Sequence, residues 1–282
     1  MKLTSYWSAM GDTGTNLSLL PEEIQPGVMV CPEAESVARV AARLFVEWAW
    51  QSIAGKGKFR VALSGGSTPR AMYKQLAGET YRTQVDWGKV HVFWGDERCV
   101  PPEDPESNYG MARRELLLRV PIPPLHVHRM EAERGDLGRA AQEYEEVLRE
   151  HLDLDARGLP RFDLILLGVG ADGHTASLFP GAEKLHETSR WASTPVGPTG
   201  KRRMTLTLPV LNAARRALFL VVGSEKAGIL RVVLEENPEP PLPAQLVAPA
   251  EGGRWFLVDG AAAALLSRRP VAMHEGTQQS GE

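Results

Sequence analysis

Cysteine and long hydrophobic runs are scarce in this sequence. Its 282 residues include only Cys31 and Cys99, which lie outside any CxxC spacing, so neither a disulfide framework nor a cysteine-built zinc site is expected. No segment approaches the ~18 uninterrupted apolar residues of a membrane span, and residues 1–16 lack the apolar core of a signal peptide. The sequence therefore predicts a protein of the reducing cytoplasm, without attachment to a membrane.

An excess of charge of either sign is also missing. Lysine and arginine total 32, aspartate and glutamate total 35, and the formal net charge is −3. Without a global basic field, neither nucleic acid nor an anionic membrane surface is expected as a partner. Because 43% of the residues are hydrophobic and 24% are charged, the composition is that of a folded globular protein. Any anionic ligand therefore has to be bound by a local site.

Two alternating patterns are present instead. Short apolar runs, typical of buried strands, occur at 59–63, 89–98, 162–168, 203–211, 216–222 and 254–259. Helical spacing of apolar residues occurs at 32–54, 68–77, 108–120, 136–152 and 224–235, with Asp136 as a predicted N-cap. The alternation predicts a three-layer α/β/α fold with a mainly parallel, Rossmann-like sheet and helices on both of its faces.

The length of the chain predicts one α/β domain with added segments. We place this domain at 28–266, between a turn-rich N-terminal extension (1–27) and a polar C-terminal tail (267–282). Ligands of open parallel sheets bind beyond the carboxyl ends of the strands. The polar motifs of this chain lie at such ends, so the site is expected there.

The first polar motif is a glycine loop between a predicted strand and a predicted helix. It consists of Ser64, Gly65, Gly66, Ser67 and Thr68. Backbone without side chains can approach an anion closely, and the free amides and dipole of the helix start attract it. We expect a phosphate or carboxylate here, although a simple tight turn also fits a Gly-Gly pair. A Walker loop is excluded because no Lys-Ser or Lys-Thr follows.

A second glycine-rich loop, at 168–173, matches G-x-G-x-x-G. A dinucleotide site is not expected, since such a fingerprint opens a regular helix, whereas Pro180 and Gly181 follow after barely one turn. We interpret Asp172 and His174 as a catalytic pair, in which the carboxylate accepts from one imidazole nitrogen and leaves the other free as a base. A turn cap beside a polar loop residue is the structural alternative.

Charged side chains lie next to other predicted strands. Asp96 and Arg98 follow one strand, where the guanidinium is suited to an anion or an oxyanion. Two cations are placed where they can meet the glycine loop. One is Lys226, and the other is Arg203 or its neighbour Arg202. Solvated surface charges are the alternative for each of them.

Two histidines, His126 and His128, are placed on one face of a predicted surface strand. Two imidazoles can contribute to a metal site, but zinc sites use at least three protein ligands, and no acidic third ligand lies nearby in the sequence. We therefore expect neither a metal nor another cofactor.

Together these segments resemble the 6-phosphogluconolactonase family, within the wider group of sugar-phosphate isomerases and deaminases. The resemblance covers residues 31–260. Four blocks carry it, in the order of the family: LSGGSTPR at 63–70, WGDERCVPPEDPESNYGMARRELL at 94–117, FDLILLGVGADGHTASLFPG at 162–181 and RMTLTLPVLNAARRALFLVVGSEKA at 203–227.

The resemblance implies roles for the residues singled out above. Asp172 orients His174 as the base, the glycine loop binds a phosphate with the help of Arg203 and Lys226, and the sugar end is lined by Asp96 and Arg98. The implied reaction is hydrolysis of a small sugar-phosphate lactone, 6-phospho-D-glucono-1,5-lactone, without a cofactor.

Two alternatives remain open. A deaminating isomerase of glucosamine 6-phosphate shares the glycine loop and the Asp-Gly-His motif, but it typically has Asp-Glu-Tyr at 96–98 and Asn-Glu-Pro at 178–180. A non-catalytic sugar-phosphate sensor would not need the intact pair of Asp172 and His174. A monomer and a small homo-oligomer are both compatible with the sequence.

Overall fold

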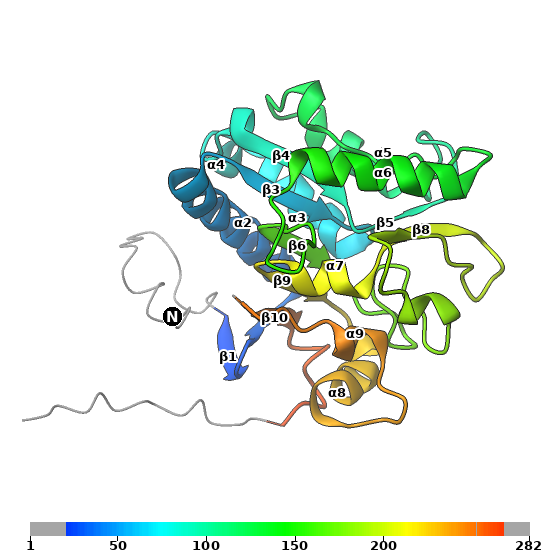
Figure 1. Cartoon of the computed structure of the whole chain (residues 1–282). Coiled ribbons are helices and arrows are strands. Elements are labelled where there is room, and N and C mark those ends of the chain that lie inside the picture. Colours follow the sequence, from blue (N-terminus) through cyan, green and yellow to red (C-terminus); the bar gives the residue numbers. More distant parts are fainter. Residues whose placement is uncertain (1–20, 252, 268–282) are drawn as a thin grey trace, which may run out of the picture.

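The computed structural model of the chain describes residues 21–251 and 253–267 (Figure 1). The predictions for residues 1–20 and 268–282 lie outside this range. The main sheet has the strand order β1-β2-β10-β9-β6-β3-β4, with β1 antiparallel to β2 and the other neighbours parallel. The strands are β1 (Glu22–Gln25), β2 (Val28–Cys31), β3 (Phe59–Leu63), β4 (Val90–Trp94), β6 (Leu164–Leu167), β9 (Ala217–Val221) and β10 (Arg254–Asp259).

Helices cover both faces of this sheet, which confirms the predicted three-layer α/β/α fold (Figure 1). Strands β3, β4, β6 and β9 are buried at every residue, as expected of parallel strands packed on both sides. Helices α2 and α3 lie on one face, and α6, α7 and α8 on the other. Their bounds are α2 (Ala34–Lys56), α3 (Ser67–Ala77), α6 (Leu137–His151), α7 (Leu208–Ala213) and α8 (Ala227–Glu235).

Shorter helices connect these elements. They are α4 (Glu79–Arg82), α5 (Asn108–Ala112), α9 (Pro243–Leu246), a π-helix at Arg113–Leu117, and 3-10 helices at Trp87–Lys89, Pro124–His126, Glu183–His186 and Ser224–Lys226. The predicted cap of α6 is confirmed, because the Asp136 carboxylate accepts the N–H of Arg139 at 3.0 Å. None of the described helices is long and apolar enough to span a bilayer.

Two predicted strands were wrong in part, because a second, antiparallel sheet takes up their polar ends. This sheet has the order β5-β8-β7, formed by β5 (Asp96–Arg98), β8 (Arg203–Leu206) and β7 (Ala192–Ser193). The run 89–98 leaves the main sheet at Gly95, and the run 203–211 turns into α7, where Pro209 occupies the first turn and needs no N–H partner there.

The strand order places a crevice between β3 and β6. The chain moves from β3 through α3 to β4 in one direction, and from β6 to β9 and β10 in the other. The loops that leave neighbouring strands in opposite directions open a gap at their carboxyl ends, and this gap is the usual ligand site of open α/β sheets. Here it receives the glycine loop that follows β3 and the Asp-Gly-His loop that follows β6.

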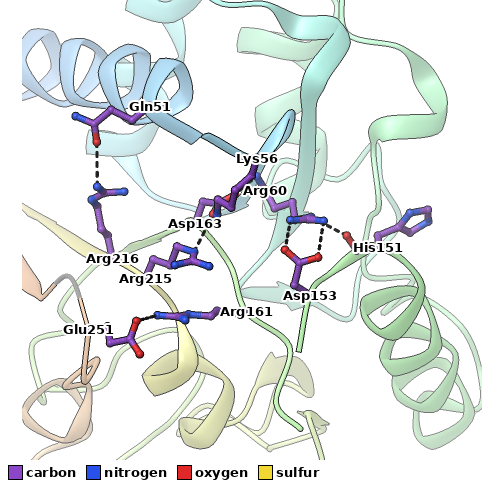
Figure 2. A network of polar contacts seen from close by, with 10 residues as sticks. All are labelled: Gln51, Lys56, Arg60, His151, Asp153, Arg161, Asp163, Arg215, Arg216 and Glu251. Carbon is purple, nitrogen blue, oxygen red and sulfur yellow. Dashed lines mark hydrogen bonds and ion pairs between the residues drawn. The ribbon is translucent and has the colours of Figure 1, made fainter. Parts of the chain in front are cut away.

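The amino ends of the same strands are held by an ion network around Asp163 (Figure 2). The Asp163 side chain is fully buried and accepts the backbone N–H of Arg60 at 3.0 Å. The ammonium of Lys56 contacts the same carboxylate, and Nε of Arg215 lies 3.4 Å from it. Removing one partner of a buried ion pair leaves the other charge uncompensated, so this network is expected to stabilise the fold rather than act on substrate.

Asp163→Asn is expected to lower the free energy of unfolding by about 2 kcal/mol, because two cations lose their anionic partner while the side-chain volume is kept. For a domain of this size that corresponds to a melting temperature about 4 to 8 °C lower in calorimetry. Glu251→Gln is the matched control, since its pair with Arg161 is 72% exposed on the glutamate side and should matter little. Equal melting temperatures for both variants would contradict the assignment.

Candidate active site

A cleft of about 400 Å³ opens at the carboxyl ends of the parallel strands. The loops after β3, β4, β6 and β9 form its walls, so four segments far apart in the sequence meet there. The predicted site residues that line it are Ser64, Gly65, Gly66, Ser67, Thr68, Asp96, Arg98, His174 and Lys226. Asp172 and Arg203 do not line the cleft themselves but contact or neighbour residues that do.

The glycine loop ends β3 and leads into α3 at the edge of the cleft. Gly66 precedes the helix with a φ of 109°, a left-handed conformation that residues with a Cβ rarely adopt. It provides no side-chain cap, so the first amides of α3 remain available to an anion in the cleft. The hydroxyl oxygen of Ser64 is buried and has no hydrogen-bond partner among the described residues.

Gly65 is required for a different reason, the close approach of Asn108. A Cβ at position 65 would lie 1.8 Å from Asn108 Oδ1, so any other residue there would displace the Asn108 amide. The amide of Asn108 donates to the backbone oxygen of Asp96 at 2.9 Å, and its Oδ1 is buried without a partner in the described part of the chain. Asn108 lines the cleft, but no spacing in the sequence indicated it, because its neighbours belong to the loop after β3 and to β5.

The predicted catalytic pair is formed. Asp172 Oδ1 lies 2.5 Å from His174 Nδ1 and also accepts the backbone N–H of His174 at 3.1 Å. Partial burial acts to raise the pKa of Asp172, but the hydrogen bonds from the backbone and ring of His174 outweigh it and lower this pKa. The carboxylate is therefore charged at neutral pH and holds the ring proton on Nδ1. The other ring nitrogen, Nε2, is left to act on a ligand.

Gly170 makes room for this pair. A Cβ at position 170 would lie 2.0 Å from Nδ1 of His174 and 2.8 Å from Oδ1 of Asp172. The backbone N–H of Gly170 donates to the carbonyl of His174 at 2.9 Å, which closes the loop. No helix starts directly after Gly173 in the structure, so the loop at 168–173 lacks the regular helix that a dinucleotide fingerprint opens.

Gly170→Ala is expected to lower kcat by about tenfold or more, because the added methyl group pushes the His174 ring from its position. Gly55→Ala is the matched control, since a Cβ there would meet no atom within 4 Å and this position in α2 does not line the cleft. Both variants should keep the circular dichroism spectrum of the parent. Wild-type kcat in Gly170→Ala would show that the position of the ring is not critical.

The two acidic residues after β4, Asp96 and Glu97, have different structural roles. Asp96 lines the cleft, and its carboxylate accepts the Ser177 hydroxyl at 2.6 Å. Glu97 is buried, and it accepts the backbone N–H groups of Asn108 and Tyr109 at 2.8 and 2.7 Å. Burial raises the pKa of Glu97 against these hydrogen bonds. Glu97 therefore anchors the start of α5, which positions Asn108, and only Asp96 faces the cleft.

Cations border the cleft on two sides. Lys226 follows β9, and its ammonium donates to the backbone oxygen of Val169 at 3.0 Å, next to the Asp-Gly-His loop. Arg98 lies opposite Arg203 in the pairing of β5 with β8, whereas Arg202 is exposed. Burial and the charge of Arg98 lower the pKa of Arg203. Nε of Arg98 and Nε of Arg203 are buried without partners among the described residues. An anion bound in the cleft would accept hydrogen bonds from them.

Comparison with known proteins agrees with this architecture. The family model of glucosamine-6-phosphate isomerases and 6-phosphogluconolactonases matches residues 32–256. The chain belongs to this family of sugar-phosphate enzymes.

Within the family, the chain is similar to 6-phosphogluconolactonases. It is 41% identical to the 6-phosphogluconolactonase of Synechocystis over 73% of this chain and 85% of the relative. It is 38% identical to the human 6-phosphogluconolactonase over 86% and 95%. The solved structure of the Trypanosoma brucei 6-phosphogluconolactonase superimposes with a TM-score of 0.78 at 30% identity, covering 87% of this chain and 100% of that one. The resemblance expected from the sequence is confirmed.

Proposed function

We propose that this chain hydrolyses 6-phospho-D-glucono-1,5-lactone to 6-phosphogluconate, the second step of the oxidative pentose phosphate pathway. The observation that carries the proposal is the meeting of three features in one cleft. These are an oriented histidine, a helix start with free amides, and the two cations Arg98 and Lys226. The named relatives are 6-phosphogluconolactonases, which supports the same substrate.

His174 performs the proton transfers. Its Nε2 takes a proton from water as the water oxygen attacks the lactone carbonyl carbon. The bond between that carbon and the ring oxygen then breaks, and the proton is returned to the departing ring oxygen. Such general acid–base catalysis contributes about 10² to 10⁴ in rate. Asp172 keeps the ring in the orientation and tautomer that this exchange needs.

The remaining groups hold the substrate. The amides of the glycine loop, Lys226 and Arg203 bind the phosphate, which fixes the carbonyl relative to His174. Asp96 and Arg98 line the sugar end, where hydrogen-bond donors also stabilise the oxyanion of the tetrahedral intermediate. The phosphate anchor therefore serves both affinity and alignment.

Parallel assays on freshly prepared 6-phosphogluconolactone and on glucosamine 6-phosphate test the proposal. Lactone hydrolysis above the spontaneous rate, without release of ammonia from the amino sugar, is expected. Ammonia release would instead identify a deaminase, and binding without turnover of either compound would identify a sensor.

Activity is expected to survive exhaustive chelation, because the base acts on water directly and the proposed steps use only side chains and backbone. Lactone hydrolysis before and after dialysis against a chelator should agree within error. Loss of activity that zinc restores, at an unchanged melting temperature, would contradict this mechanism.

We also place the protein in the cytoplasm. Cys31 is buried, Cys99 is partly buried, and both are free thiols. Burial raises the pKa of both, which keeps them unreactive thiols suited to a reducing compartment. Fractionation of cells that express the tagged full-length chain is the direct measurement.

A further inference from the structure

Four histidines gather at the edge strand β4, toward its amino end and so away from the cleft. His91 belongs to β4 and His151 ends α6. His126 and His128 lie beside β4. The backbone N–H of His128 donates to the carbonyl of Val92, in β4, at 2.8 Å. Ring centroids are 4.0 Å apart for His91 and His126, and 4.1 Å apart for His128 and His151. We call these four residues the histidine cluster.

The cluster has the spacing of a metal site. One ring nitrogen from each of His91, His128 and His151 lies within 4.8 Å of the other two. Nδ1 of His91 and Nε2 of His128 are 3.2 Å apart. Zinc binds imidazole nitrogen at about 2.0 to 2.1 Å in tetrahedral geometry, which separates two ligands by about 3.3 Å. One pair already has this separation, and rotation about side-chain bonds can bring in the third.

The fourth ring of the cluster holds a polar atom that is buried without a partner. Nδ1 of His126 makes no hydrogen bond in the described part of the chain, whereas buried polar groups are normally paired.

The charges around the cluster permit a cation. Arg60, whose charge acts on His91, is paired with Asp153 at 2.8 and 3.0 Å. Figure 2 shows the His151 ring pointing away from this pair. Lys58 is exposed, so its charge is screened by solvent. The carboxylate of Glu150 lies 3.9 Å from Nε2 of His151 and adds negative charge beside the cluster.

We propose that the histidine cluster binds a divalent transition metal of the kind that prefers imidazole, with zinc as the test ion. His91, His128 and His151 supply three ligands, His126 packs against them, and water takes the remaining position. Such an ion ties β4, the segment beside it and the end of α6 together. Its role is structural, since the cluster contributes no residue to the cleft. The spacing of the sequence did not indicate this cluster, because His91 and His151 come from segments distant from His128.

Calorimetric titration of the metal-free full-length chain with Zn²⁺ tests the proposal. We expect one ion per chain and a melting temperature that rises with zinc concentration. His128→Asn and His151→Asn should each weaken binding by about tenfold or more. The exposed His186 supplies the control His186→Asn, which should bind as the wild type does. His151→Asn, at a partly exposed helix end, keeps the test valid if His128→Asn fails to fold.

Two further measurements separate this site from the cleft. His174→Ala should retain zinc binding, and Co²⁺ in place of zinc should give the intense visible bands of a tetrahedral complex that His151→Asn loses. Absence of saturable binding, wild-type affinity in both cluster variants, or loss of binding in His174→Ala would each overturn the proposal.

Discussion

His174→Ala is expected to hydrolyse 6-phosphogluconolactone about 10² to 10⁴ times more slowly than the wild type, because it lacks the group that moves the proton. The affinity for 6-phosphogluconate should stay nearly unchanged, since the base acts on water and contributes little to binding of the ground state. Initial rates corrected for spontaneous opening of the lactone, together with product binding by calorimetry, measure the two quantities. A near wild-type kcat would remove His174 from the mechanism.

Asp172→Asn separates orientation from proton transfer. The asparagine keeps the size of the side chain, but its amide permits the wrong imidazole tautomer, so kcat should fall while the base itself is still present. A variant as active as the wild type would show that the hydrogen bond of 2.5 Å between Asp172 and His174 has no role in catalysis.

Removing the phosphate from the substrate is expected to lower kcat/KM by about 10³ or more. Each charge-assisted hydrogen bond contributes about 1.5 to 3 kcal/mol, which is roughly ten- to hundredfold in affinity, and several are lost with the phosphate. Some of the loss should appear in kcat, because the anchored phosphate also aligns the carbonyl with His174. The measurement compares gluconolactone with its 6-phosphate under identical conditions.

Lys226→Ala removes one partner of that phosphate and should lower kcat/KM on the phosphorylated lactone by about ten- to hundredfold. On unphosphorylated gluconolactone the same variant should resemble the wild type. Lys74→Ala, at an exposed position of α3, is the matched control. If both lactones were equally good substrates, or if Lys226→Ala were indistinguishable from the wild type, the glycine loop would be only a turn.

Local features of this protein could be predicted from its sequence because the interacting residues are close along the chain. Asp172 and His174 are two positions apart, so a tight loop is enough to bring the carboxylate to the ring. The strand, glycine loop and helix at 59–77 form one continuous unit. The apolar runs predicted buried strands and the parallel sheet, and the parallel order in turn predicted that the polar ends would share one edge.

Other features depended on which strands became neighbours. β5 and β8 pair antiparallel, which sets Arg98 opposite Arg203 and turns the run at 203–211 away from the main sheet. Asn108 reaches Gly65 only because the helix that carries it packs beside the β3 loop. Each of these contacts joins residues separated by dozens of positions, and their sequence neighbours carry no periodicity that encodes the pairing.

The histidine cluster shows most clearly the difference between contacts within one segment and contacts between distant segments. The sequence by itself determined that His126 and His128 are two residues apart, and with two ligands it predicted no metal. Only the tertiary structure brought His91 from the edge strand and His151 from the end of α6 to within 4.8 Å of His128. The physical reason is that contacts within a segment follow from local backbone geometry. Contacts between segments depend on the strand order of the sheet, which no short stretch of sequence specifies.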